Sequence, residues 1–306
     1  MTGRLKSEAG FALILTLVVT ALMVAVVTEM IHQVYVDVSL SRSFRDGQQA
    51  SILAESGVTG GAKLLRMALS GRTYTSLTDR WATPFKIDDE AGSLEITISE
   101  ESGKINVNDV TQPKSMEILE RLGKRLKLPV DIWPAVKDWV DTDDIPVSGG
   151  AESSYYRTLV PPYSARNDRM QAVTELSLVK GVSTDILGKL RPFLTVYAEQ
   201  RNSPLSKINV NTAPKEVLTA LDDRIDDSMA ERIIHERSVQ PFTSTGQLSR
   251  VPGMETISPG LGGIISVQGT LFKITSVARV KDAGRTVEAV LRVSNGGTDV
   301  LSWQEY

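Results

Sequence analysis

The densest group of chemically active side chains is an acidic segment near the middle of the 306-residue chain. Residues 138–156 read DWVDTDDIPVSGGAESSYY, in which clustered aspartates are followed by a glycine turn and a glutamate. Calcium prefers such hard oxygen atoms and takes about 6–8 of them, backbone carbonyls and water included. We predict a calcium site here, with Asp141, Asp143 and Glu152 as its preferred side-chain ligands and Asp144 as the next candidate.

Spacing alone leaves other interpretations of this segment open. A solvated acidic loop has the same composition, and the spacing does not match the roughly 12-residue loop of an EF-hand. Paired carboxylates could also serve a glycosidase, but no aromatic substrate-binding motif accompanies them. Asp138 precedes Trp139 in a predicted helix and could cap or pair locally. Tyr155, Tyr156 and Tyr163 are expected to pack around the loop.

Composition excludes several other kinds of site. The chain has no cysteine, which rules out thiol catalysis, cysteine-ligated zinc and disulfides. Its two histidines, His32 and His235, lie far apart in the sequence, so neither a histidine metal site nor a catalytic triad is expected. The net charge is -3, without the basic excess of a nucleic-acid-binding domain. We therefore expect neither an enzyme nor a nucleic-acid partner.

The acidic segment lies between two copies of a short repeat. Residues 103–109 read GKINVND and residues 206–212 read SKINVNT. Their polar residues are natural N-caps, and Pro214 suits the first turn of a helix. Helical sequence follows at residues 115–126, 214–221 and 228–237. We predict two small helical modules, at residues 109–205 and 206–265.

Strand patterns lie on both sides of this helical region. Residues 93–100 alternate polar and apolar side chains, as a half-buried strand does. Residues 271–280 and 285–293 are two further strands, joined by a hairpin turn at residues 281–284. The predicted fold class is therefore α+β. A small antiparallel sheet forms from residues 71–108 and 266–306, with the helical modules inserted between its strands.

The N-terminus predicts a membrane anchor. Residues 1–10 form a short polar leader with two basic side chains, and residues 11–28 carry no charge. As a helix, these apolar residues span roughly 27 Å, close to the thickness of about 30 Å of the hydrocarbon core. We place the transmembrane part at residues 11–31, within a helix that continues to residue 70. Its later apolar face is formed by Ala54, Val58, Gly61, Leu65 and Leu69.

The junction between the leader and the apolar segment distinguishes three hypotheses. A secretory signal peptide would have a shorter apolar core and a small-x-small cleavage site, which is absent here. A plain signal anchor would keep Arg4 and Lys6 inside the cell. A basic leader that ends in glycine before a phenylalanine resembles the type IV prepilin signal. This resemblance implies cleavage between Gly10 and Phe11 by the prepilin peptidase, followed by N-methylation of Phe11.

One position departs from the usual prepilin pattern. Most prepilin-like proteins have glutamate at the fifth mature position, where it neutralises the N-terminal ammonium of a neighbouring subunit in the membrane. That position is Leu15 here. An unpaired carboxylate in the membrane is costly, so a subunit with no neighbour above it gains nothing from carrying one. The K-type minor pseudopilins of type II secretion systems are the family members that lack this glutamate.

The second module resembles helix-hairpin-helix or SAM-like sequence at residues 208–214, 230–237 and 241–253. Combined with the prepilin-like helix, this arrangement resembles the K-type minor pseudopilins along nearly the whole chain. Members of that family carry a similar Asp-Trp-x-Asp-x-Asp and Gly-Ala-Glu pattern in a helical insertion that binds calcium. The resemblance implies a structural calcium ion that orders the glycine-rich acidic segment.

The resemblance also implies a function and a location. The protein would cap and initiate the periplasmic pseudopilus that exports proteins across the outer membrane. It would cross the inner membrane once, with its C-terminal head in the periplasm. The implied partners are the other minor pseudopilins, the major pseudopilin, the prepilin peptidase, the inner-membrane assembly platform, and exported substrate or the outer-membrane secretin.

Two alternative functions share parts of this sequence. A membrane-anchored DNA receptor would bind phosphate through the hairpins at residues 179–182 and 251–254, but each hairpin lacks the second glycine of the usual motif. A minor pilin of a type IV pilus would share the N-terminus but is not expected to carry the paired insertion.

Overall fold

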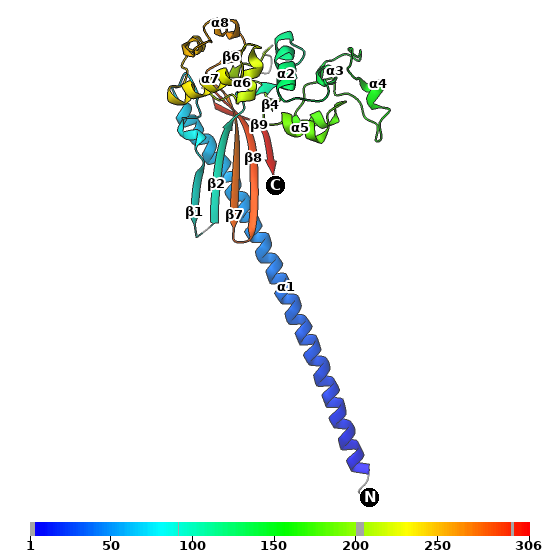
Figure 1. Cartoon of the computed structure of the whole chain (residues 1–306). Helices are drawn as coiled ribbons and strands as arrows, with labels where there is room; N and C mark the ends of the chain where they lie inside the picture. Colours follow the sequence, from blue (N-terminus) through cyan, green and yellow to red (C-terminus); the bar gives the residue numbers. More distant parts are fainter. Residues whose placement is uncertain (1–3, 91, 200–204, 295–296) are drawn as a thin grey trace.

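A single long helix, α1 (Arg4–Leu69), leads from the N-terminus into the head of the molecule in the computed structural model (Figure 1). The structure describes residues 4–90, 92–199, 205–294 and 297–306. Within α1, an apolar window with a mean hydropathy of 2.7 is wholly unburied, and by length and composition it could cross a membrane. The helix begins at Arg4 rather than at residue 11, because the described part of the leader contains no proline to interrupt it. Residues 1–3 of the predicted leader lie outside the described residues.

The C-terminal half of α1 packs on an antiparallel sheet of five strands in the order β1-β2-β7-β8-β9. The hairpin between β7 and β8 is tighter than predicted. Val280 pairs with Ala283, so Lys281 and Asp282 alone form the turn, and Lys281 has a φ of 52°. The strands are β1 (Phe85–Asp89), β2 (Gly92–Glu100), β7 (Leu271–Val280), β8 (Ala283–Ser294) and β9 (Gly297–Glu305).

The predicted apolar face of α1 forms one side of the core beneath this sheet. Ala54, Val58 and Leu65 are buried there and belong to the same cluster as Phe272 and Ile274. A glycine at position 57 lets the helix approach the sheet closely, because a Cβ there would overlap the Ser276 hydroxyl and Leu94. The helix, the sheet and the helical region inserted between β2 and β7 confirm the predicted α+β class.

The first helical module begins at β3 and ends at β4, which pair in parallel. Because residues 105–106 supply a strand of this module, it starts earlier than the predicted boundary at residue 109. Its elements are β3 (Ile105–Asn106), a 3₁₀ turn (Val107–Asp109), α2 (Pro113–Arg125), α3 (Trp133–Val140), α4 (Ser153–Tyr156), a 3₁₀ turn (Val173–Leu178), α5 (Thr184–Leu190) and β4 (Leu194–Thr195).

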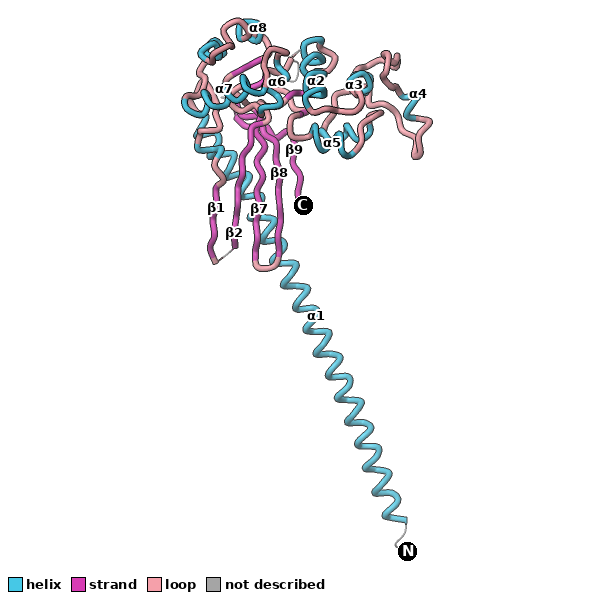
Figure 2. Tube along the Cα trace, in the orientation of Figure 1, coloured by secondary structure: helices cyan, strands magenta, loops and turns pink. Residues whose placement is uncertain are grey.

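The second helical module repeats this plan, with β5 and β6 pairing in parallel. Its elements are β5 (Ile208–Asn209), α6 (Lys215–Leu221), α7 (Asp227–Val239), a 3₁₀ turn (Thr245–Arg250), α8 (Ser258–Leu261) and β6 (Ile265–Ser266). The two modules share one hydrophobic core, separate from the core beneath the sheet. Figure 2 shows that loops make up much of both modules. Specific side-chain contacts must therefore hold these loops in place.

The sequence repeat supplies the same contact in both modules. Asn108 accepts a hydrogen bond from the Met170 N–H at 2.7 Å and donates to the carbonyls of Met170 and Val196. Asn211 accepts from the Phe242 N–H at 2.9 Å and donates to two carbonyls in the same way. Each asparagine thus joins the end of a long segment, at Met170 or Phe242, to the residue that follows the last strand of its module.

A buried glutamate joins the sheet to the second module. Glu100, at the end of β2, accepts hydrogen bonds from Asn209 Nδ2 at 2.6 Å and Thr212 Oγ1 at 3.0 Å. Its other carboxylate oxygen is buried and has no hydrogen-bond partner among the described residues. Burial is the largest influence on this carboxyl group and raises its pKa to about 7.

Candidate metal centre

Helix α3 delivers the chain to the acidic loop, which we define as residues 141–152. Asp138, in the last turn of α3, is fully buried and accepts the Val147 N–H with both carboxylate oxygens, each at 3.2 Å. A Cβ at Gly150 would overlap the Asp138 carboxylate, so this position of the loop requires glycine. Asp138 therefore holds the loop against α3, as the local-pairing hypothesis predicted.

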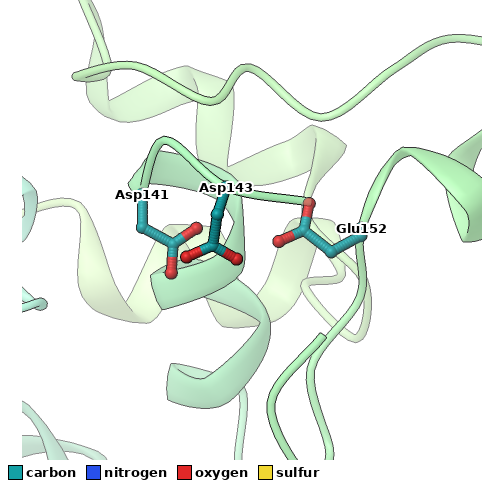
Figure 3. Close-up of side chains that lie close together, drawn as sticks. All are labelled: Asp141, Asp143 and Glu152. Carbon is teal, nitrogen blue, oxygen red and sulfur yellow. The ribbon is translucent and has the colours of Figure 1, made fainter. Parts of the chain in front are cut away.

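Three carboxylates meet within the acidic loop. One oxygen each from Asp141, Asp143 and Glu152 lies within 4.8 Å of the others (Figure 3). Asp143 stands between the other two, and the carboxylates of Asp141 and Glu152 are directed toward it. These are the three residues that the sequence analysis preferred as ligands. The loop brings them together because Asp141 and Asp143 follow α3 directly, whereas Glu152 precedes α4.

The electrostatics of this cluster are unfavourable without a cation. Glu152 is 1% exposed, and burial together with the charges of Asp138 and Asp141 raises its pKa to about 7. Burial and the neighbouring Asp143 charge also raise the pKa of Asp141. Like charges at this separation repel strongly in a partly buried site. A cation placed among the three carboxylates would relieve this repulsion.

Unpartnered oxygens provide an independent test of the fit to a metal ion. Both carboxylate oxygens of Glu152 and Oδ1 of Asp141 are buried without a hydrogen-bond partner in the described part of the chain. Buried acceptors left unsatisfied in this way are uncommon in folded proteins. They are also the hard oxygen ligands that calcium takes. The donor set therefore fits a calcium ion bound by Asp141, Asp143 and Glu152.

Asp144 occupies a different position from the other predicted ligands. It lies outside the group of three, and its Oδ1 accepts the Ser153 N–H at 3.3 Å at the start of α4. Its charge is one of those that raise the pKa of Glu152. The side chain thus helps to fold the loop back onto α4, and its role as a direct ligand stays a prediction.

Aromatic side chains form the wall behind the acidic loop, as the sequence suggested. The Trp139 ring meets Tyr156 edge-on at 5.0 Å, and the Tyr156 ring stacks on Tyr163 at 5.3 Å. Tyr155 also contacts Tyr156, at 5.2 Å. The rings thus pack α3, α4 and the segment after α4 against one another.

The hairpins at residues 179–182 and 251–254 use their amide groups within the chain. In the first hairpin, the Lys180 N–H donates to the Tyr156 hydroxyl at 3.2 Å, while Lys180 Nζ binds the Gly150 carbonyl at 3.0 Å. In the second, the Gly253 N–H donates to Glu255 Oε2 at 2.9 Å, and Pro252 has no N–H to offer. These contacts do not favour the DNA-receptor hypothesis, which needs free amides to bind phosphate.

Two residues of the site were not predicted from the sequence. Lys180 anchors the loop from the first hairpin, and Asn167 binds the backbone carbonyls of Trp139 and Asp143. Neither has a sequence signal, because an isolated lysine or asparagine in a polar stretch is ordinary. The predicted processing site lies in α1, with Phe11 69% exposed beside Gly10.

Comparison with known proteins agrees with this architecture. The model of the first domain of type II secretion system protein K matches residues 103–199, and a second model for protein K matches residues 208–268. Together the two matches cover just over half of the chain. They coincide with the two helical modules.

Full-length relatives show the same similarity. The chain is 25% identical to type II secretion system protein K of Aeromonas hydrophila, over 96% of this chain and 99% of that protein. It is 27% identical to protein K of Pseudomonas aeruginosa, over 95% of this chain and 91% of that protein.

A solved structure shares the fold. It is the GspK-GspI-GspJ complex of the type II secretion system of enterotoxigenic Escherichia coli, one chain of which matches with a TM-score of 0.72 and 21% identity. The match covers 87% of this chain and 99% of that chain. Because the two protein K models together match just over half of it, the chain belongs to the type II secretion system protein K family, the K-type minor pseudopilins.

Proposed function

We propose that this minor pseudopilin occupies the tip of the periplasmic pseudopilus, where it caps the fibre and starts its assembly for protein export. The observation that carries the proposal is the position of the helical modules. Both lie at the end of the head farthest from the N-terminus of α1, beyond the sheet (Figure 1). A subunit stacked above this one would meet the modules before it reached the sheet. Leu15, in place of the usual glutamate, agrees with a subunit that has no neighbour above.

The membrane part of the proposal rests on α1. Its unburied apolar segment would anchor the protein once in the inner membrane, with the head in the periplasm. The prepilin peptidase would cut between Gly10 and Phe11 and methylate Phe11. The exposed segment around this junction is compatible with access by that enzyme.

The partners follow from the proposed place in the fibre. A similar chain in a solved structure is assembled with GspI and GspJ. We propose corresponding minor pseudopilins as the direct partners here, with the major pseudopilin below them. The fibre would meet the inner-membrane assembly platform at its base. At its tip it would meet either exported substrate or the outer-membrane secretin. Catalysis and nucleic-acid binding form no part of this proposal.

Calcium has a structural role in this proposal. Asp141, Asp143 and Glu152 would hold the ion, whose positive charge would offset theirs and would give the buried oxygens of Asp141 and Glu152 a partner. Binding would order the acidic loop, which is rich in glycine and carries mutually repelling charges. The Gly150 carbonyl of the loop and Tyr156 just after it both contact Lys180 of the first hairpin, so an ordered loop would also stabilise this hairpin.

The tip position can be tested by locating the protein on assembled pseudopili. Immunogold labelling of an epitope-tagged chain should place gold at one end of each fibre. An equivalent tag on the major pseudopilin should label the whole length and serves as the control. Labelling of this chain along the length of the fibre would contradict the capping role.

Processing can be tested in the same strain. Gly10→Ala should leave a full-length precursor that migrates above the wild-type protein on an immunoblot, and export should fail. Gly60→Ala is a matched change, because a Cβ at position 60 meets nothing within 4 Å. It should be processed normally. Normal processing of Gly10→Ala would rule out the prepilin assignment of the leader.

A further inference from the structure

The side chain of Asn167 is fixed at the edge of the carboxylate cluster. Its backbone N–H donates to the Trp139 carbonyl at 3.0 Å, at the end of α3. Its side-chain Nδ2 donates to the backbone carbonyl of Asp143 at 2.9 Å. Both contacts are with the short segment that also carries Asp141. Asn167 is therefore tied to the same stretch of backbone that positions two of the three carboxylates.

These contacts determine which way the amide group is turned. The Asp143 carbonyl can only accept a hydrogen bond, so the group facing it must be the NH₂ of Asn167. The amide oxygen, Oδ1, consequently lies on the other side of the group. This oxygen is buried and has no hydrogen-bond partner among the residues that the structure describes.

The unpartnered oxygen of Asn167 belongs with the others in this loop. Asp141 Oδ1 and both oxygens of Glu152 are buried acceptors in the same condition, and all lie within one folded segment of the first module. Acceptors alone cannot satisfy one another, because none has a proton to donate when the carboxyl groups are ionised. A cation that contacts all of these oxygens would give each of them a partner.

The backbone of Asn167 is also suited to this position. Its φ is 49°, in the left-handed region that asparagine tolerates better than most residues. Asparagine carbonyls are ordinary calcium ligands. A neutral oxygen adds to the coordination without adding a fourth negative charge to Asp141, Asp143 and Glu152. Aspartate at this position would supply the oxygen at the cost of further repulsion in the metal-free loop.

We propose that Asn167 Oδ1 is a direct calcium ligand beside Asp141, Asp143 and Glu152. This inference rests on the proposed calcium site and adds a ligand from a segment beyond α4. Asn167 ties the chain that returns to Met170 to the chain that leaves α3.

Calorimetric titration of calcium into full-length protein in detergent, first stripped of metal with a chelator, tests this assignment. Asn167→Gly keeps the left-handed backbone and removes the ligand oxygen, and it should weaken calcium affinity by about tenfold or more. Asn167→Asp keeps an oxygen and should bind calcium at least as tightly as wild type. Asp168→Asn is the matched control, because this exposed neighbour loses its charge without touching the cluster.

Terbium bound in place of calcium gives a readout that a merely structural residue would not move. Its luminescence lifetime, compared in light and heavy water, counts the water molecules bound to the ion. Asn167→Gly should gain about one bound water over wild type, whereas Asp168→Asn should gain none. In chelator, Asn167→Gly should melt slightly below wild type, because it also loses the hydrogen bond to the Asp143 carbonyl, but it should unfold in a single cooperative transition as wild type does.

The outcomes separate this inference from the calcium proposal itself. Wild-type binding with unchanged affinity and unchanged hydration in Asn167→Gly would overturn the role of Asn167 and leave the three-carboxylate site standing. Absence of binding by the wild-type protein would overturn both. Weaker binding together with one additional water would establish Asn167 as a ligand.

Discussion

The two helical modules are built from the same turn, the same pair of parallel strands and the same hairpin, but only the first carries an acidic loop. In the first module, 62 residues separate Asn108 from its backbone partner Met170. In the second, 31 residues separate Asn211 from Phe242. We call the segment between the asparagine and this partner the arm of the module. The arm of the first module is therefore twice as long as that of the second, and its additional residues include the three clustered carboxylates.

The shorter arm of the second module is stabilised by groups of the chain itself. Arg237 in α7 is 7% exposed and donates from one nitrogen to the carbonyls of Val210 at 2.6 Å and Ala213 at 2.8 Å. Burial lowers the pKa of this guanidinium to about 10, so it stays charged at neutral pH. The first module has buried anions in its arm where the second has a buried cation. Under the proposed calcium site, a cation from solution would stabilise the longer arm as Arg237 stabilises the shorter one.

The largest expected effect tests whether Asn108 and Asn211 contribute equally to the stability of the protein. Asn108→Ala and Asn211→Ala each remove a side chain that satisfies three buried backbone groups. Each should lower the free energy of unfolding by about 3–5 kcal/mol, as expected for several lost hydrogen bonds and stranded polar groups. Denaturant titration in calcium should give losses within about 1 kcal/mol of each other. A loss confined to one variant would break the equivalence.

The next effect concerns the ion. Asp143→Ala combined with Glu152→Ala should cost about 2.7 kcal/mol of stability when calcium is present at about 100 times its dissociation constant. In chelator the loss should nearly vanish, because the variant also relieves repulsion between carboxylates. The matched control is Asp227→Ala with Glu231→Ala on the second module, where both carboxylates face Lys215 at the surface. Equal losses in calcium and chelator would argue against an ion site.

The junction between the sheet and the second module should respond to pH. The pKa of Glu100 is raised to about 7 in the folded protein, against about 4.5 when unfolded. The folded state therefore holds this proton more tightly, and the resulting stability is complete below about pH 4.5 and is lost as the pH rises through 7. Glu100→Gln stays neutral at every pH. Between pH 5 and pH 8, its free energy of unfolding should therefore fall by about 2 kcal/mol less than that of wild type. Parallel stability curves for the two proteins would refute the assignment.

The smallest effect compares the hairpin glycines. Gly181 and Gly253 have φ values of 84° and 93°, so alanine at either position is strained by about 1–2 kcal/mol. Gly253→Ala should cost more, because its Cβ would approach Met229 Cε at 2.9 Å, whereas the nearest atom at Gly181 is at 3.5 Å. Thermal unfolding of both variants measures the difference. The reverse order would contradict the closer packing around Gly253.

Periodicity and repetition made most of the fold predictable. The apolar face of α1, the hairpin strands and the repeated KINVN motif each have a regular pattern that a short stretch of sequence carries in full. The edge strands β1 and β9 were not identified as strands, because Phe85–Asp89 is exposed along its whole length and β9 lacks regular burial. The start of the first module was misplaced because its strand consists of Ile105 and Asn106 alone.

The candidate site was predictable only in part, for a related physical reason. Asp141, Asp143 and Glu152 follow one another within a short loop, and carboxylates signal their chemistry by type. Asn167 and Lys180 reach the loop from distant segments through single contacts with backbone carbonyls, at Asp143 and Gly150. Any polar residue of suitable length could make such a contact, so sequence alone does not single them out.

Hydrogen exchange of the full-length protein in detergent, with and without calcium, tests most directly the claim that an ion stabilises the longer arm. We predict that calcium slows exchange strongly between Asp138 and Asn167 and in the hairpin that contains Lys180. Residues 208–268 of the second module should change little. Equal protection of both modules, or no change between Asp138 and Asn167, would contradict the account.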